Sequence, residues 1–310
     1  AAGPIALSVG SNTITTLVTA QDTVTTRSYN VAVTRLSPNL ALQHPAGSGL
    51  LHLGTKGFGS IPVDTFTILT FTIVNTGTDV LDGILPNIVG YQNAIDDDGD
   101  GLFDEEDESG FTLETTGTDP DLAPSESTTF NVKFSPYREG GFATTLSIAS
   151  NDPDTNPYEV TITGAGLIPV MKLTGNSTTI TNGDSTPSAG DHTDFGNLPL
   201  LDSHVTRTFS IVNEGLAPLH LAGTPRVTLS GPDAAEFTVI TQPDSSVAPS
   251  GSTSFAIRFD PDFPGLRAAT VSILSNDPDD SPYSFSISGM GGLTVKRKQS
   301  ILFAPPTTVY

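Results

Sequence analysis

The sequence predicts an all-β protein made of β-sandwiches in tandem, with partial sandwich elements at both ends. The composition is rich in turn-forming residues, with 30 Gly and 24 Pro among 310 residues, as expected for many short strands joined by tight turns. Apolar and polar residues alternate over short segments, which is the period of a half-buried strand. A long segment also occurs twice, which indicates two homologous domains.

The repeat is defined by two pairs of matching segments. Residues 122–136 correspond to residues 247–261, which lie 125 positions later. The motif Ser-Asn-Asp-Pro-Asp, which begins at Ser150, recurs at the same distance. We therefore expect two sandwich domains, over 37–167 and 168–293.

Strands are predicted in each copy from alternating residues such as Phe130, Val132 and Phe134. The same alternation recurs along both copies and predicts roughly seven strands in each domain. The other inward-facing residues are Leu69, Phe71, Ile73, Leu146, Ile148, Tyr158, Val160 and Ile162, and in the second copy Phe209, Ile211, Phe255, Ile257, Phe259, Val271, Ile273, Tyr283, Phe285 and Ile287. We interpret the Asn-Asp-Pro-Asp segments as hairpin turns, because Asn and Asp cap turns and Pro fixes φ; a weak interdomain calcium contact is the alternative.

The first copy is longer than the second between the matched segments. Residues 71–75 correspond to residues 209–213, which lie 138 rather than 125 positions later, so the first copy holds 13 extra residues. An acidic run of that length occupies residues 96–108. We expect a loop insertion over about 93–108 in a sandwich that folds without it, and we expect function to lie in this insertion.

The acidic run contains nine carboxylates in thirteen positions and no Lys or Arg. Crowded carboxylates repel one another, whereas a hard divalent cation that takes about six to eight oxygens stabilises them. The spacing favours Ca²⁺, because Asp96, Asp98 and Asp100 recur at every second residue, Gly101 provides a sharp turn, and Asp occupies the ninth and twelfth positions of the run. The predicted ligands are Asp96, Asp98, Asp100, Asp104 and Asp107. A solvated acidic loop is the alternative.

The loop departs from an EF-hand, because Asp107 replaces the usual final Glu and neither flank has the periodicity of a helix. The run Asn93-Ala94-Ile95 followed by Asp-rich sequence instead resembles the calcium loops of thrombospondin type 3 and related bacterial surface repeats. This resemblance implies calcium binding without a pair of helices.

Several separated motifs point to a known family. Thr-Asp-Phe-Gly at 193–196, Thr-Phe-Ser-Ile-Val-Asn-Glu-Gly at 208–215, Ala-Ala-Glu-Phe at 234–237 and the Ser-Asn-Asp-Pro-Asp motif resemble the choice-of-anchor D family of immunoglobulin-like sandwiches, which is related to hydin-type domains. The resemblance covers both copies and implies non-enzymatic modules of secreted or surface-anchored bacterial proteins. In the first copy, Phe58-Gly59 stands in place of the full Thr-Asp-Phe-Gly motif.

Both ends are predicted to be partial sandwich elements. Residues 1–36 resemble the last strands of a cadherin-like β-sandwich, which bury too little surface to be stable alone. Residues 294–310 are predicted to form a basic linker, with Lys296, Arg297 and Lys298, and the first strand of an incomplete domain. Either neighbouring domains of a longer chain cover these elements, or identical subunits complete each other's sheets head to tail by β-strand addition.

Charge and motif content exclude several classes of function. The formal net charge of -21 repels nucleic acid, and no apolar segment is long enough for membrane insertion within this chain. There is no Cys for disulfides or thiolate chemistry. The five His residues are scattered, and no catalytic motif occurs, so an enzyme is not expected. A metal site at Asp191-His192-Thr193-Asp194 is less favoured than a turn.

These observations predict an extracellular structural or adhesive segment of a bacterial surface or filament-forming protein, stiffened by Ca²⁺. The alternative is a carbohydrate-binding or accessory module of a large secreted hydrolase, in which the calcium loop contacts surface glycans.

Overall fold

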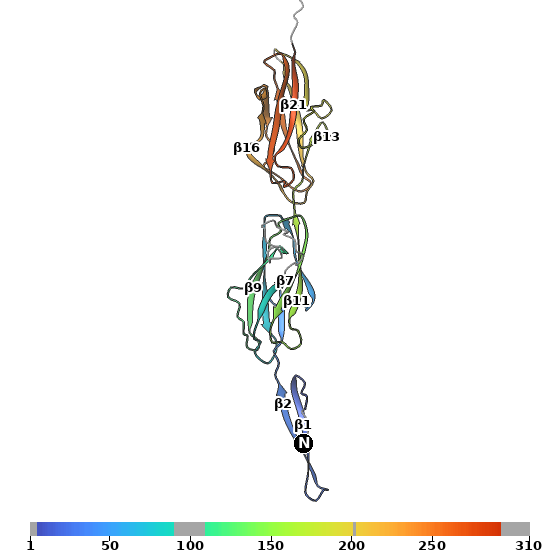
Figure 1. Ribbon diagram of the computed structural model, residues 1–310, viewed down its shortest axis with the longest axis vertical. Helices are drawn as coiled ribbons and strands as arrows, with labels where there is room; N and C mark the ends of the chain where they lie inside the picture. Colours follow the sequence, from blue (N-terminus) through green and yellow to red (C-terminus); the bar gives the residue numbers. More distant parts are fainter. Residues whose placement is uncertain (1–4, 90–108, 201–202, 293–310) are drawn as a thin grey trace, which may run out of the picture. The chain divides into compact units, whose positions relative to one another are not determined.

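The computed structural model describes residues 5–89, 109–200 and 203–292 (Figure 1). These residues form strands and connecting loops almost throughout, which confirms the all-β fold class. No helix in the described ranges is long and apolar enough to cross a membrane. The chain divides into two compact units, Ala1–Leu167 and Ile168–Tyr310. We call them unit 1 and unit 2.

Unit 1 begins with a hairpin of two strands, β1 (Gly10–Thr19) and β2 (Thr26–Arg35), which pair antiparallel as a sheet of their own. Asp22 organises the turn between them, because its carboxylate accepts the backbone N–H of Val24 at 3.0 Å and of Thr25 at 2.8 Å. The paired register places apolar side chains on one face, and each of them is exposed or half-buried. They are Ile14, Val18, Tyr29, Val31 and Val33.

The rest of unit 1 is a sandwich of a four-stranded and a five-stranded sheet. Its strands are β3 (Leu40–Gln43), β4 (Gly49–Leu50), β5 (Gly54–Pro62), β6 (Thr67–Asn75), β7 (Leu85–Val89), β8 (Phe111–Glu114), β9 (Ser127–Phe134), β10 (Gly140–Ala149) and β11 (Tyr158–Leu167). The sheets have the orders β5-β11-β10-β7 and β4-β3-β6-β9-β8. Among these described strands, β5 and β11 form the only parallel pair, and the other pairs are antiparallel.

Unit 2 is a sandwich of two five-stranded sheets. Its elements are β12 (Met171–Gly175), β13 (Thr178–Ile180), β14 (Asp194–Pro199), β15 (Val205–Asn213), β16 (Leu219–Ser230), the 3₁₀ helix η2 (Ala234–Glu236), β17 (Phe237–Thr241), β18 (Ser246–Val247), β19 (Ser252–Phe259), β20 (Gly265–Ser275) and β21 (Tyr283–Gly292). The sheets have the orders β14-β21-β20-β16-β18 and β13-β12-β15-β19-β17, so the arrangement of unit 1 is repeated.

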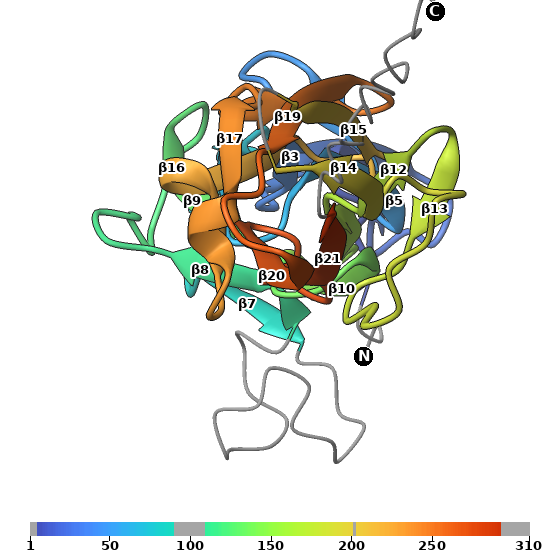
Figure 2. The ribbon, with the colours of Figure 1, turned by 90° about the horizontal axis from the view of Figure 1, so that it is seen from above.

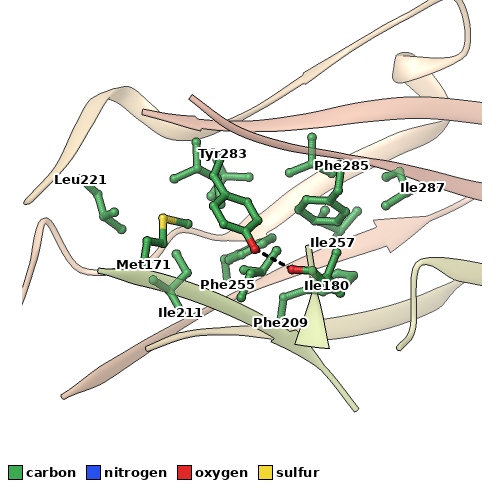
Figure 3. Packing of buried hydrophobic residues seen from close by; sticks show 14 of the residues in the cluster. Met171, Ile180, Phe209, Ile211, Leu221, Phe255, Ile257, Tyr283, Phe285 and Ile287 are labelled. Atoms are coloured by element: carbon green, nitrogen blue, oxygen red, sulfur yellow. Dashed lines mark hydrogen bonds between the residues drawn. The ribbon is translucent and has the colours of Figure 1, made fainter. Parts of the chain in front are cut away.

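Each sandwich has its own hydrophobic core, built from the alternating residues. In unit 2, Phe209 and Phe255 lie opposite each other on β15 and β19, and their ring centroids are 5.2 Å apart (Figure 3). The corresponding pair in unit 1 is Phe71 and Phe130, with centroids 5.4 Å apart. The side chains that the period-two pattern assigned to the interior are therefore the ones that pack there.

A buried tyrosine joins the two sheets of each sandwich. Tyr283 on β21 donates its hydroxyl proton to the carbonyl of Ile180 on β13 at 2.6 Å (Figure 3). Burial, with a smaller contribution from the negative charge of Asp280, raises the pKa of Tyr283 to about 12. Tyr158 on β11 makes the equivalent hydrogen bond to the carbonyl of Leu50 on β4.

The described sandwiches contain more strands than the roughly seven predicted for each domain. The additional strands include β4, β13 and β18, which are two or three residues long and pair at the edges of their sheets. A segment of that length is too short to show an alternating pattern, so the sequence carries no signal for it.

Candidate functional site

The predicted calcium ligands lie outside the residues that the structure describes: Asp96, Asp98, Asp100, Asp104 and Asp107. The described residues on either side define their place in the fold. β7 ends at Val89, and the next described residue is Ser109, two positions before the start of β8.

The insertion is attached to edge strands of different sheets. β7 pairs with β10 at the end of the four-stranded sheet, and β8 pairs with β9 at the end of the five-stranded sheet. β7 and β8 lie side by side on one side of the sandwich (Figure 2). A ligand that fixed residues 90–108 would therefore connect the two sheets at this edge.

Backbone pairing fixes the chain where it enters the insertion. Leu85 through Val89 pair with β10, and Val89 lies opposite Thr145. The carbonyl of Val89 also accepts a hydrogen bond from the Thr144 hydroxyl at 2.7 Å. The last described residue before the insertion thus belongs to the framework.

Tight packing fixes the chain where it leaves the insertion. Gly110 has a φ of +73°, and a Cβ added there would lie 2.8 Å from the ring of Phe142. The carbonyl of Gly110 accepts the backbone N–H of Ser135 at 2.8 Å. Phe111 is fully buried and stacks on Phe134 with ring centroids 4.7 Å apart. The chain therefore returns directly into the core.

Unit 2 has a short connection at the same place in the fold. Residues 231–236, which include η2, join β16 to β17. Asp233 in this connection forms an ion pair with Arg267 at 2.9 Å and accepts the backbone N–H of Ala268 at 3.2 Å. The hydrogen bond from Arg267 lowers the pKa of Asp233. Phe142 occupies the position of Arg267 in unit 1, so packing against Gly110 replaces this ion pair.

The Ser-Asn-Asp-Pro-Asp motifs form the turns of the hairpins β10–β11 and β20–β21, which confirms the turn prediction. Each motif also carries a buried carboxylate that the sequence did not predict. Asp152 accepts the backbone N–H of Leu40 at 2.8 Å and of Asp154 at 2.9 Å. Asp277 accepts the backbone N–H of Met171 at 2.6 Å. The turn is thereby bonded to the first strand of each sandwich.

These hydrogen bonds determine the charge state of Asp152. Burial alone raises its pKa, but hydrogen bonds from Leu40, Asp154 and Thr155 together lower the pKa below its ordinary value. Its oxygens are therefore engaged by donors of the protein itself. In the part of the chain that the structure describes, no group of three or more His, Asp or Glu is placed to hold a metal ion.

The Asn that precedes each buried Asp bonds a neighbouring loop. The side chain of Asn151 donates to the carbonyl of Val80 at 3.0 Å and accepts the backbone N–H of Asp82 at 3.0 Å. Asn276 accepts the backbone N–H of His220 at 2.6 Å in the same way. The motif is therefore a structural connection at one end of each sandwich.

A second buried polar residue, repeated in both units, was not predicted from the sequence. Asn75 is fully buried, and its amide donates to the carbonyl of Leu122 at 2.9 Å and accepts the backbone N–H of Gly77 at 2.9 Å. Asn213 bonds the carbonyl of Val247 at 3.1 Å in unit 2. The available signal was that both residues end the repeated segment Phe-x-Ile-Val-Asn.

The Asp191-His192-Thr193-Asp194 segment is a turn that leads into β14. The carboxylate of Asp191 accepts two hydrogen bonds from Thr193, one from the backbone N–H at 3.0 Å and one from the side-chain hydroxyl at 2.5 Å. His192 has a φ of +68°. Burial, and then the positive charge of Arg207, lower the pKa of His192. The carboxylate of Asp191 thus organises the turn, which confirms the favoured interpretation.

No protein-family model matches the chain, and no curated protein matches it. The chain is distantly similar to several solved structures. A protein of unknown function from Porphyromonas gingivalis W83 is 18% identical over 74% of this chain and 95% of that chain, with a TM-score of 0.29. The PapD-like domain 7 of human CEP192 is 10% identical over 42% of this chain and 86% of that chain, with a TM-score of 0.26. The E. coli chaperone DraB is 10% identical over 81% of this chain and 98% of that chain, with a TM-score of 0.23.

Similarity at these TM-scores carries no argument about fold or activity, so the class of the protein follows from its own sheets. Each unit contains two packed, mainly antiparallel sheets, which is the architecture of immunoglobulin-like sandwiches. The class defined by the fold is therefore that of tandem immunoglobulin-like β-sandwich proteins.

Proposed function

We propose that this chain is a non-enzymatic structural or adhesive segment of an extracellular bacterial protein, and that Ca²⁺ bound in the acidic insertion stiffens its first sandwich. The choice-of-anchor-D-like motifs support the extracellular setting. The alternating carboxylates Asp96, Asp98 and Asp100, followed by Gly101, support the choice of cation.

The observation that carries this proposal is the attachment of the insertion to edge strands of both sheets. An ion that orders the insertion would oppose separation of β7 from β8. Extracellular calcium modules bind at about 0.1 to 1 mM. Each tenfold excess of Ca²⁺ over its dissociation constant then adds about 1.4 kcal/mol to the free energy of unfolding.

Thermal unfolding of the full chain tests the proposal. We expect about 5 mM Ca²⁺ to raise the Tm of unit 1 by about 2 to 6 °C relative to a chelator, and Asp98→Asn plus Asp100→Asn to remove this shift. Asp64→Asn plus Asp154→Asn is the matched control, because it removes two exposed carboxylates of the same unit. An identical Tm with Ca²⁺ and with chelator would refute calcium stiffening.

Head-to-tail assembly is a second candidate, and the β1–β2 hairpin favours it. Tyr29 and Val31 on its apolar face are each 52% exposed, and an isolated two-stranded sheet is marginally stable. The tail strand of an identical subunit could pair with this hairpin. A disulfide between Val9→Cys and Ile301→Cys of two chains would support assembly, and its absence at high concentration would favour a longer chain whose neighbouring domains cover the hairpin.

A carbohydrate-binding accessory module is the third candidate. β16 bulges between Ala222 and Val227, and the bulge encloses a hollow of about 330 Å³ lined by residues that include Pro225, Arg226 and Leu274. This hollow offers both apolar and hydrogen-bonding groups to a sugar. A glycan array probed with the full chain, with and without Ca²⁺, distinguishes this role from a purely structural one.

A further inference from the structure

A tight turn in unit 1 exposes two leucines. Residues 51–54 connect β4 to β5, and the backbone N–H of Gly54 donates to the carbonyl of Leu51 at 2.9 Å, which closes the turn. The side chains of Leu51 and Leu53 are 80% and 70% exposed. We call these two residues the leucine turn.

The sandwich itself does not need a leucine at this turn. The backbone N–H of Leu53 donates to the carbonyl of Glu159 at 2.7 Å, and that of Gly183 donates to the carbonyl of Ser284 at 2.7 Å, so the two turns are equivalent. The backbone φ is +58° at Leu53 and +80° at Gly183. A leucine adopts such a φ at a cost in free energy that glycine does not incur. A strained and exposed leucine where unit 2 has glycine therefore indicates contact with a partner.

The hollow formed by the bulge of β16 occurs in the other unit. The bulge holds residues 223–226, between Ala222 and Val227, which lie opposite consecutive residues of β20. The corresponding strand of unit 1, β7, pairs with β10 without a bulge. The hollow has a volume of about 330 Å³, and a cavity of about 150 Å³ already admits benzene, so a leucine side chain fits. The apolar lining comes from Ala222, Pro225, Leu274 and Pro282.

Charge favours contact between the leucine turn and this hollow. Glu159 lies beside the leucine turn, because its backbone N–H donates to Nδ1 of His52 at 3.0 Å and its carbonyl accepts from Leu53. Arg226 lines the hollow, where its Nη1 donates to the carbonyl of Pro243 at 3.2 Å. Neither Glu159 nor Arg226 forms an ion pair within the described part of the chain. The two surfaces thus carry opposite, uncompensated charges.

We propose that the leucine turn of one chain inserts into the hollow of a second copy, with Glu159 of the first chain against Arg226 of the second. Insertion removes the exposed leucines from water and pairs the two charges. Because the turn and the hollow belong to different units, the contact is heterologous and leaves a free turn and a free hollow for further copies. This assembly uses neither the β1–β2 hairpin nor the tail, so it is independent of strand addition.

Sedimentation of the full chain tests the proposal. The contact is small, so we expect the mean mass to double only between about 0.01 and 0.5 mM protein. The turn variant, Leu51→Ser plus Leu53→Gly, and the hollow variant, Leu274→Asp, should each stay monomeric over this range. Leu17→Ser plus Leu216→Ser is the matched control, because these leucines are 62% and 64% exposed and belong to neither surface; it should associate like the unaltered chain.

Mixing the two variants separates this contact from other modes of assembly. The turn variant keeps an intact hollow and the hollow variant keeps an intact turn, so an equal mixture should form pairs with the mass of two chains. Charge reversal gives a second test. Glu159→Arg and Arg226→Glu should each weaken association about fivefold or more, and the two together should restore it.

Three results would overturn the proposal. The first is an unaltered chain that stays monomeric over the whole concentration range. The second is association that persists in both variants, which would indicate strand addition instead. The third is a mixture that stays monomeric although both variants keep the Tm of the unaltered chain and are therefore folded.

Discussion

The carboxylate of Asp152 accepts the backbone N–H of Leu40 at 2.8 Å, although 112 positions separate the two residues. Asp277 and Met171 repeat this bond at 2.6 Å across 106 positions. In each sandwich, the turn of the last hairpin is thereby joined to the first strand, which belongs to the opposite sheet.

Replacing Asp152 by Ala is expected to lower the free energy of unfolding of unit 1 by about 2 to 4 kcal/mol. The substitution leaves the N–H of Leu40 buried without an acceptor, and hydrogen bonds to charged groups are among the stronger ones. Calorimetry of the full chain should show a lower transition for unit 1 alone. Asp154→Ala is the control, because the Asp154 side chain is exposed. Equal effects of the two substitutions would contradict the role of the buried carboxylate.

Acidification should destabilise unit 1 through the same carboxylate. The pKa of Asp152 is below its ordinary value of 3.8 in the folded protein, so the folded state binds the proton less readily than the unfolded chain. The ionised form therefore stabilises unit 1 above about pH 3.8, and this contribution is lost as the pH falls through the lower folded pKa. Calorimetric scans from pH 6 down to about pH 2.5 should show a smaller loss of stability in Asp152→Asn. If the unaltered chain and Asp152→Asn lost stability equally as the pH falls, Asp152 would not be the group responsible.

Replacement of the buried Asn213 by Ala should destabilise unit 2 by about 2 to 4 kcal/mol. The carbonyls of Ala217 and Val247 and the N–H of Gly215 each lose a hydrogen bond inside the protein. Asn75→Ala should have a similar effect confined to unit 1. Chemical unfolding followed by hydrogen exchange assigns each loss to its unit. A loss below about 0.5 kcal/mol at both positions, the level of an ordinary surface substitution, would rule out the proposed role.

Gly110→Ala should destabilise unit 1 by more than Gly117→Ala does. Both glycines have positive φ, +73° and +89°, but an added Cβ meets the ring of Phe142 only at Gly110. Placing Ala at a positive φ costs about 1 kcal/mol in both substitutions. At Gly110 the clash of the new Cβ with Phe142 adds about 1 to 3 kcal/mol. Thermal unfolding measures the difference. Equal destabilisation would show that the return from the insertion is not tightly packed.

Much of the fold follows from local sequence patterns. The all-β class and the inward faces of the main strands could be predicted because side-chain alternation reports directly on a half-buried sheet. The buried Asp152 and Asn75 could not be assigned partners, because their acceptors and donors are backbone groups brought close only by the tertiary fold. Short edge strands such as β4 were missed because two or three residues are too few to show an alternating pattern.

Less of the candidate site could be predicted. The sequence identified the insertion by comparing two copies, and the structure adds its attachment to β7 and β8. The ligand assignment to Asp96, Asp98, Asp100, Asp104 and Asp107 stays a prediction, because these residues lie outside the described part of the chain. The spacing of carboxylates indicates a cation, but coordination depends on backbone geometry that spacing does not define.

The bond between Asp152 and Leu40 also has a mechanical consequence. Tension applied between the ends of the chain enters each sandwich at its first strand, which begins at Leu40 in unit 1 and at Met171 in unit 2. The N–H groups of these two residues are the ones that the buried carboxylates hold. Pulling the first strand away must therefore break a charged hydrogen bond as its first step. The force needed to unfold each sandwich should decrease when Asp152 or Asp277 is replaced by an uncharged residue.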